Sequence, residues 1–243
     1  MVLNVLASTD DGPTSEAAPI VATWLGRLGY HEALALQRQL VAARADDRIG
    51  DRLLLLEHPP VLTLGRNADP AHILASAETL HARGIEVVQV ERGGEVTYHG
   101  PGQLVAYPIL ALSRRGLMIR PLVRALEAAL IATCGAHGVI GARLDGRPGC
   151  WCDPLGSSPR KIGALGLRVE RGVSYHGIAL NVTVDLADFD LIDPCGMQGV
   201  TSTSIAAELG QHDARPSSEG VERAAIIFAH ALANELGAPL DGV

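Results

Sequence analysis

The sequence predicts one α+β domain with two mainly antiparallel sheets and surrounding helices. The 243 residues are 47% hydrophobic and include 27 Gly and 14 Pro, enough for a packed core with many turns. Short apolar and β-branched runs outnumber helical segments, and hairpin turns outnumber regular strand–helix–strand units. Repeats and long linkers are absent from the sequence. We therefore expect a single domain over residues 21–243, behind a loosely ordered leader at residues 1–20.

The first half of the chain alternates helices and short strands. Apolar residues at helical spacing predict an amphipathic helix over 30–44, which begins the folded part. Residues 51–66 indicate a buried strand, a Pro-Pro turn and a second strand, and residues 77–84 a short helix ended by Gly84. Strands follow over 85–90 and 103–110, separated by a glycine-rich segment.

The second half contains the clearest helix, over 120–138, with Pro in its first turn. Residues 161–182 predict two strands joined by a hairpin turn at 170–172. A later helix is expected to be capped by Ser202 or Thr203. The terminal helix presents one apolar face, made of Val221, Ala225, Phe228, Ala229, Leu232 and Leu236.

Charge and cysteine usage exclude several classes of function. A net charge of -7 and a pI near 5.7 argue against nucleic acid or a membrane surface as partner, because phosphate recognition needs a basic face. The N-terminus has no export signal and no run of about 20 apolar residues exists, so we expect a cytoplasmic protein. Cys150 and Cys152 form a Cys-x-Cys pair, but no second pair follows. Reduced thiols and no metal site are expected.

Lys161 is the only lysine among the 20 Lys and Arg residues of the chain. A coding bias against lysine explains the excess of arginine, and Lys161 could be an ordinary surface residue. Arginine, however, stays charged, whereas a desolvated lysine can release its proton. A position that must move a proton cannot be filled by arginine, which makes Lys161 a candidate acid/base.

Cys195 is the candidate nucleophile. It lies in "IDPCGM" on a predicted loop beside a helix start, where backbone amides can stabilise a thiolate. Cys134, late in an amphipathic helix, is expected to fill the core. A reactive thiol needs a base or cation nearby, and the candidates are Lys161, His99 and His176. His176, on a predicted strand, fits a structural role as well as an accessory catalytic one.

The segment "RGGEVTYHGPGQ" (92–103) matches neither a dinucleotide fingerprint nor a phosphate loop. Its glycines permit unusual backbone conformations and close approach to a ligand. A set of tight hairpin turns is one interpretation. Because Arg92, Tyr98 and His99 converge on it, a wall of a binding pocket is the alternative that we favour.

Five motifs in one order resemble a known family: "LLLEHPPVLTLGR", "RGGEVTYHGPGQLVAYPI", "RKIGALGLRV", "SYHGIALNV" and "DPCGM". The family is the octanoyltransferases of lipoate biosynthesis (LipB proteins), and the resemblance covers about residues 30–236. It implies the fold of biotin and lipoate protein ligase catalytic domains. It also implies that Cys195 takes an octanoyl group from acyl carrier protein as a thioester and passes it to a lysine of a lipoyl domain, with Lys161 as acid/base. The acceptors would be 2-oxoacid dehydrogenases and the glycine cleavage H protein, and no cofactor is implied.

The resemblance also implies which residues bind the acyl group, with small side chains leaving room for the alkyl chain. They are Arg92, Gly93, Gly94, Glu95, Val96, Thr97, Tyr98, His99, Ala164, Leu165, Gly166, Gly177, Ile178 and Ala179. The chain departs from the family at 149–159, where Cys150 and Cys152 are interpreted as packing substitutions. A monomer is expected. A basic patch for the acidic carrier protein is expected at Arg114, Arg115, Arg120 and Arg124.

Three alternatives stay open. A lipoate ligase that activates free acid with ATP shares the scaffold and a lysine but has no use for a nucleophilic thiol. An amidotransferase that moves octanoyl between two protein domains would use the same cysteine. A silent acyl-binding module could keep the glycine-rich wall but would have no need for both Lys161 and Cys195.

Overall fold

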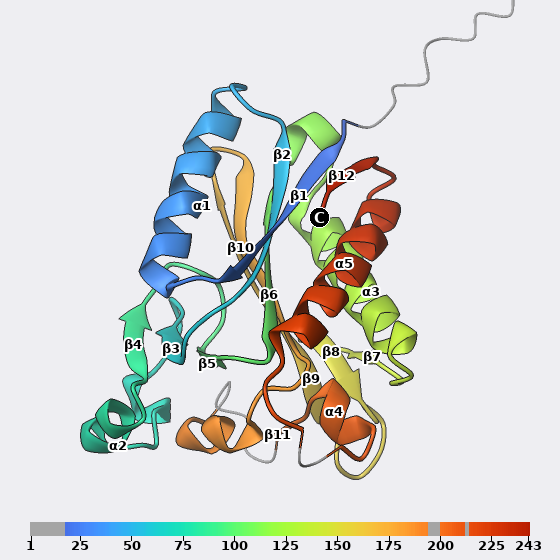
Figure 1. The fold of residues 1–243 in the computed structure, drawn as a ribbon. Helices are drawn as coiled ribbons and strands as arrows, with labels where there is room; N and C mark the ends of the chain where they lie inside the picture. The colour runs from blue at the N-terminus through green and yellow to red at the C-terminus, as the bar shows by residue number, and fades with distance from the viewer. Residues whose placement is uncertain (1–17, 194–199, 212–213) are drawn as a thin grey trace, which may run out of the picture.

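The computed structural model describes residues 18–193, 200–211 and 214–243. Within them, one large mixed sheet has the strand order β12-β1-β2-β6-β10-β9-β8-β7, with β11 paired to β9 (Figure 1). Its strands are β1 (Ile20–Arg27), β2 (Asp51–Glu57), β6 (Gln103–Ile109), β7 (Ala142–Leu144), β8 (Arg147–Cys152), β9 (Arg160–Glu170), β10 (Val173–Asn181), β11 (Thr201–Ser202) and β12 (Leu240–Gly242).

A small sheet in the order β4-β3-β5 lies beside the large one. Its strands are β3 (Val61–Leu64), β4 (Glu86–Gln89) and β5 (Val96–His99). The α-helices are α1 (Tyr30–Ala45), α2 (Ala77–Ala82), α3 (Ile119–Ala136), α4 (Ile205–Glu208) and α5 (Ser218–Glu235), and short 3-10 turns are η1 (Pro70–His72), η2 (Ser113–Arg115) and η3 (Leu186–Leu191).

The two faces of the large sheet are covered differently. Helices α3 and α5 pack together on one face, and Leu126, Leu130 and Phe228 join the main core there (Figure 1). Helix α1 covers the other face, where Ala33 meets Tyr107 and other buried residues of β2, β6 and β10. Alternate residues of each central strand therefore belong to different cores, as the period of two requires.

The antiparallel prediction is confirmed for β2, β6, β10, β9, β8 and β7 and for β3 with β5. One expectation was wrong. A strand, β1, precedes the helix that was expected to begin the folded part. It pairs in parallel with β2 and with β12 at the far end of the chain. The predicted leader falls at residues 1–17 outside the described residues, and β1 begins at its last position, Ile20.

Local signals were correct where a turn decides the conformation. Arg171 and Gly172 both have positive φ, of 50° and 79°, as a two-residue hairpin between β9 and β10 requires. The sequence placed the cap of α4 too early, because Ser202 belongs to β11 and pairs there with Lys161 of β9. Ser204 caps the helix instead, its hydroxyl oxygen accepting from the Ala207 amide at 3.1 Å.

The cysteines in the described residues are packed in the interior. Cys134 and Cys150 are fully buried, with their Sγ atoms 4.0 Å apart, and Cys152 lies beside them in the main core. Burial raises the pKa of Cys152 to about 12. The Cys152 thiol is therefore neutral near pH 7, and the burial of all three side chains agrees with their interpretation as core residues.

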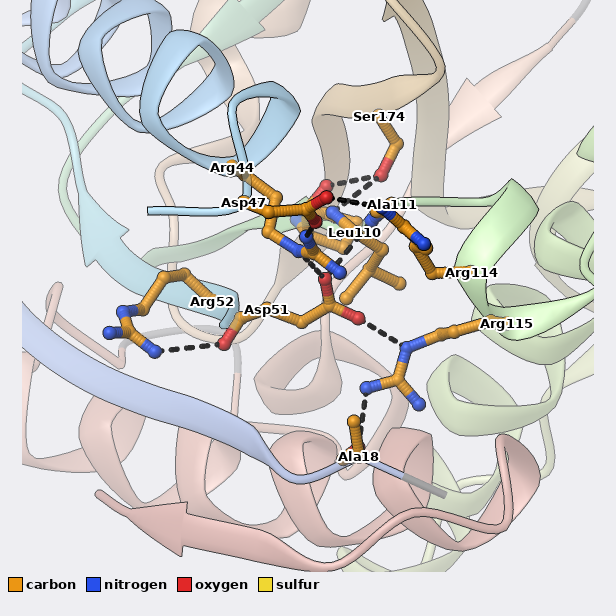
Figure 2. Close-up of polar contacts among 11 residues, drawn as sticks. Ala18, Arg44, Asp47, Asp51, Arg52, Leu110, Ala111, Arg114, Arg115 and Ser174 are labelled. Atoms are coloured by element: carbon orange, nitrogen blue, oxygen red, sulfur yellow. Dashed lines mark hydrogen bonds and ion pairs between the residues drawn. The ribbon is translucent and has the colours of Figure 1, made fainter. Parts of the chain in front are cut away.

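A buried carboxylate, Asp51, ties the start of β2 to two other parts of the chain (Figure 2). Its Oδ1 accepts from Arg44 Nε at 2.6 Å and from the Ala111 amide at 3.0 Å, and its Oδ2 accepts from Arg115 Nε. The Arg115 guanidinium also donates to the Ala18 carbonyl at 2.7 Å. The Asp51 side chain is 1% exposed and is the buried counter-ion of both arginines, while Arg44 also pairs with the partly exposed Asp47 at 2.7 Å.

Replacing Asp51 with asparagine should lower the free energy of unfolding by about 3–5 kcal/mol, because Arg44 and Arg115 would keep their charges without a buried counter-ion. Urea unfolding measures this change. Asp46→Asn, which breaks an exposed pair with Arg171, is the matched control and should leave the midpoint unchanged. An Asp51→Asn midpoint equal to that of the control would contradict the assignment.

Candidate active site

An open cavity of about 810 Å³ lies on the face of the large sheet that α1 covers. It is bounded by β5, β6, β9 and β10 and by the start of α1. The predicted residues that line it are Arg92, Gly94, Glu95, Val96, Thr97, His99, Lys161, Ala164, Leu165, Gly166, His176, Gly177, Ile178 and Ala179. Those not predicted are Tyr30, Gln103, Tyr107, Gly163, Asn181, Phe189 and Ser202.

Two residues of the predicted acyl-binding set lie elsewhere. Tyr98 is 1% exposed and points into a second core, where its hydroxyl donates to Asp188 Oδ2 at 2.6 Å and its ring meets Phe189 edge to face. Its neighbours Thr97 and His99 line the cavity, as alternation along a strand dictates. Gly93 faces β9, and its amide donates to the Leu167 carbonyl at 3.0 Å.

The sequence suggested that the small residues leave room for an alkyl chain. At Gly166 and Gly177 the structure gives a different reason for glycine. A Cβ at Gly166 would lie 2.7 Å from the Gly93 carbonyl oxygen, and one at Gly177 would lie 2.0 Å from that of Ala106. Both positions therefore need glycine because another backbone segment passes too close for a side chain. The glycines bring the cavity walls together.

Arg92 holds the glycine-rich segment against β3. It is 8% exposed, and its guanidinium donates to the Thr63 carbonyl at 2.7 Å and hydroxyl at 2.8 Å. It also donates to the carbonyls of Glu95 at 2.9 Å and Gly93 at 3.0 Å. Five N–H donors in a rigid fork suit such a set of backbone acceptors.

A β-bulge places Lys161 on the cavity side of β9. Cys150 of β8 pairs with Gly163 and the next residue, Trp151, pairs with Lys161, so Ile162 is an extra residue in β9. Ile162 packs in the main core, and a Cβ at Gly163 would touch Leu130 on the same side. Lys161 is thereby returned to the face that lines the cavity, with its Nζ 5.3 Å from the centroid of the Trp151 ring.

A row of buried amides connects the cavity wall to the strand that carries Lys161. His99 Nδ1 donates to Gln103 Oε1 at 2.7 Å, and Gln103 Nε2 donates to Asn181 Oδ1 at 2.9 Å. Asn181 Nδ2 donates to the Thr203 carbonyl at 2.8 Å, and the Thr203 amide donates to the Lys161 carbonyl at 2.9 Å. Periodicity could not reveal these partners, because their meeting depends on the register of β6, β10 and β11.

The predicted nucleophile, Cys195, lies outside the described residues. The chain before it is anchored by an Ile73–Ile192 bridge and by the Asp193 amide, which donates to the His72 carbonyl at 2.8 Å. The chain after it pairs with β9 through Ser202.

Comparison with known proteins places the chain in a family. Residues 29–224 match the family of lipoyl protein ligase A/B catalytic domains. An octanoyltransferase from Acidobacterium capsulatum is 50% identical over 220 residues, which cover 87% of this chain and 89% of that protein. The chain belongs to the octanoyltransferase family. An octanoyltransferase from Chloroflexus aurantiacus is 51% identical over 189 residues, covering 77% and 83% of the two chains.

Solved structures agree with this octanoyltransferase family in fold. A lipoate-protein ligase A bound with ATP superimposes with a TM-score of 0.61 at 14% identity, covering 93% of this chain and 89% of that one. A bi-partite lipoate protein ligase from Thermoplasma acidophilum gives a TM-score of 0.58 at 13% identity, with coverages of 94% and 88%. The expected lipoate ligase-like fold is therefore confirmed.

Three histidines in and beside the cavity of this family member are held neutral. Burial lowers the pKa of His58 to about 4, of His99 to about 3 and of His176 to about 4. His58 Nδ1 donates to the Leu28 carbonyl at 2.7 Å, so its Nε2 is the acceptor for the Tyr107 hydroxyl at 2.8 Å. His99 Nδ1 likewise donates to Gln103 Oε1, so Nε2 of the neutral His99 ring carries no proton.

Residues 18–193, 200–211 and 214–243 contain no group of three or more His, Cys, Asp or Glu that could hold a metal ion. None of the helices formed by these residues has both the length and the apolar character needed to cross a bilayer.

The neutral histidines should make the fold sensitive to mild acid. The unfolded chain takes up protons near pH 6.5, whereas His58, His99 and His176 resist protonation until about pH 4 or below. The free energy of unfolding should therefore fall as the pH drops from 6.5 towards 4, by up to about 1.4 kcal/mol per pH unit for each histidine. Urea unfolding at a series of pH values measures this slope. His58→Gln should reduce the slope, and an equal slope in the variant would contradict the assignment.

Proposed function

We propose that the protein transfers an octanoyl group from acyl carrier protein to the lysine of a lipoyl domain through a thioester on Cys195. The observation that carries the proposal is the position of Lys161. The only lysine of the sequence is placed by a β-bulge at the side of a cavity with a mainly apolar lining, and it is paired through β11 to the chain that follows Cys195.

In the first half-reaction, Lys161 as a neutral amine takes the proton of the Cys195 thiol. The thiolate attacks the carbonyl carbon of the donor thioester, a new carbon–sulfur bond forms, and the bond to the carrier sulfur breaks. The leaving thiolate receives the proton from the Lys161 ammonium. Proton shuttling of this kind needs a group that can exist in both states, which excludes arginine.

In the second half-reaction, the acceptor lysine amine attacks the same carbonyl carbon. The amide bond forms, the bond to Cys195 Sγ breaks, and the surplus amine proton passes through Lys161 to the cysteine thiolate. The Trp151 ring, 5.3 Å from Lys161 Nζ, supports this role because an aromatic face favours the ammonium that pairs with the thiolate.

The expected basic patch for the carrier protein is narrower than the sequence suggests. Arg115 is 7% exposed and pairs with Asp51, and Arg114 donates to Asp47. Both lie in η2, which follows the C-terminal end of β6. Gln103, at the other end of β6, lines the cavity. Arg120 and Arg124 remain exposed, with Arg124 Nη1 3.7 Å from Glu127. The carrier protein as donor therefore rests on the thioester chemistry.

The intact mass of the protein after brief incubation with octanoyl-loaded acyl carrier protein tests the mechanism. We expect a hydroxylamine-labile octanoyl adduct on the native protein, none on Cys195→Ser, and slow formation on Lys161→Ala, by about 100-fold or more. Lys161→Arg should be equally slow, because arginine keeps the positive charge but cannot release a proton near neutral pH.

The rival functions give different results in the same experiment. An ATP-dependent ligase would form no adduct and would modify a lipoyl domain from free octanoate and ATP. An adduct formed from an octanoylated protein domain but not from the carrier would indicate an amidotransferase. No adduct and no transfer from any donor would leave a binding module.

A further inference from the structure

Among the cavity-lining residues of β10, His176 lies farthest along the strand from Asn181, which is joined through Thr203 to Lys161. Lys161 is half-buried, whereas His176 is 1% exposed. In β10, Leu180 pairs with Gly163 next to the bulge, and Asn181 lies at the Lys161 end of the cavity. At about 3.4 Å per residue, the Cα atoms of Asn181 and His176 are roughly 17 Å apart along the strand.

The backbone is distorted to present this side chain. His176 has a φ of 53° in the middle of β10, a left-handed conformation that side chains rarely adopt. Its amide donates to Gln37 Oε1 of α1 at 2.8 Å, and the following residue must be glycine because of the Ala106 carbonyl. Such strain persists only where the surroundings enforce it, and it concentrates at functional positions.

The imidazole is fixed and polar. It stacks on the Tyr175 ring with centroids 4.8 Å apart and meets the Tyr107 ring edge to face at 6.3 Å. Its Nε2 is buried and has no hydrogen-bond partner among the described protein atoms. A buried nitrogen of this kind penalises any apolar group that covers it.

We propose that His176 sets the acyl chain length by closing the inner end of the cavity with a rigid, polar ring. An extended eight-carbon chain spans roughly 9 Å from carbonyl carbon to methyl, given C–C bonds near 1.5 Å, whereas a twelve-carbon chain spans roughly 14 Å. The shorter chain ends before the imidazole. The longer one meets the rigid ring, whose buried Nε2 has no hydrogen-bond partner among the described protein atoms. This inference rests on the acyl transfer proposed above.

The test compares kcat/KM for octanoyl- and dodecanoyl-loaded acyl carrier protein, with a lipoyl domain as acceptor, in the full-length protein. His176→Gly accommodates a φ of 53° without strain and opens the inner end, so the dodecanoyl-to-octanoyl ratio should rise about tenfold or more. His176→Leu has a similar volume and no polar nitrogen, and the ratio should rise about threefold. His176→Asn, smaller and tolerant of positive φ, should also raise the ratio.

Arg171→Gly is the matched control. It relieves the same kind of backbone strain, at a φ of 50°, in the exposed turn between β9 and β10 and outside the cavity. Its ratio should equal that of the native protein. Unchanged ratios in the glycine and asparagine variants, with octanoyl transfer measurable, would overturn the role of His176 in setting chain length and leave the proposed function intact. Absence of octanoyl transfer by the native protein would instead overturn the proposed function.

Discussion

The bulge at Ile162 is the constraint on which the site depends. Without the extra residue, the alternation of β9 would place Lys161 on the main-core side, like Gly163. With it, Ile162 and Gly163 both belong to the core, while Lys161 and Ala164 both reach the cavity. Burial of the Ile162 side chain in the main core offsets the pairing lost at the bulge. Strand β11 and the Thr203 amide then fix the Lys161 backbone from the other side, so the main chain of the proposed acid/base is held at two points.

The cavity wall satisfies polar groups mainly without ionising them. A buried carboxylate would repel a thiolate, and a second buried cation would compete with Lys161 for the thiolate. Neutral amides and imidazoles do neither. The path from His99 through Gln103 and Asn181 uses such groups to join three strands. Arg92 is charged, and its N–H groups are directed at the backbone carbonyls of Thr63, Gly93 and Glu95. Glu95 and Lys161 also line the cavity. The neutral groups of the β5, β6 and β10 walls suit a site that must hold an alkyl chain.

Residue types in short motifs identified Lys161 and the glycine-rich wall from the sequence, because both are local chemical signals. Gln103, Asn181 and Tyr30 could not be found, since they meet only through strand register and the docking of α1. Strand β1 was missed for the same reason: its partners are β2 and the distant β12. The ion pair of Arg115 with Asp51, 64 residues away, likewise removed an arginine from the expected basic surface.

The low pKa values of the three histidines have a consequence for proton transfer near neutral pH. His58, His99 and His176 titrate at about 4 or below, so their protonation is constant across the range in which an enzyme of this kind works. A neutral imidazole whose conjugate acid is this strong is a poor base for a thiol or an amine. His99 and His176 can therefore orient a substrate or limit its length, but they cannot carry the proton between donor and acceptor. This agrees with the proposed mechanism, which assigns the proton transfer to Lys161, the one lysine in a chain that otherwise uses arginine.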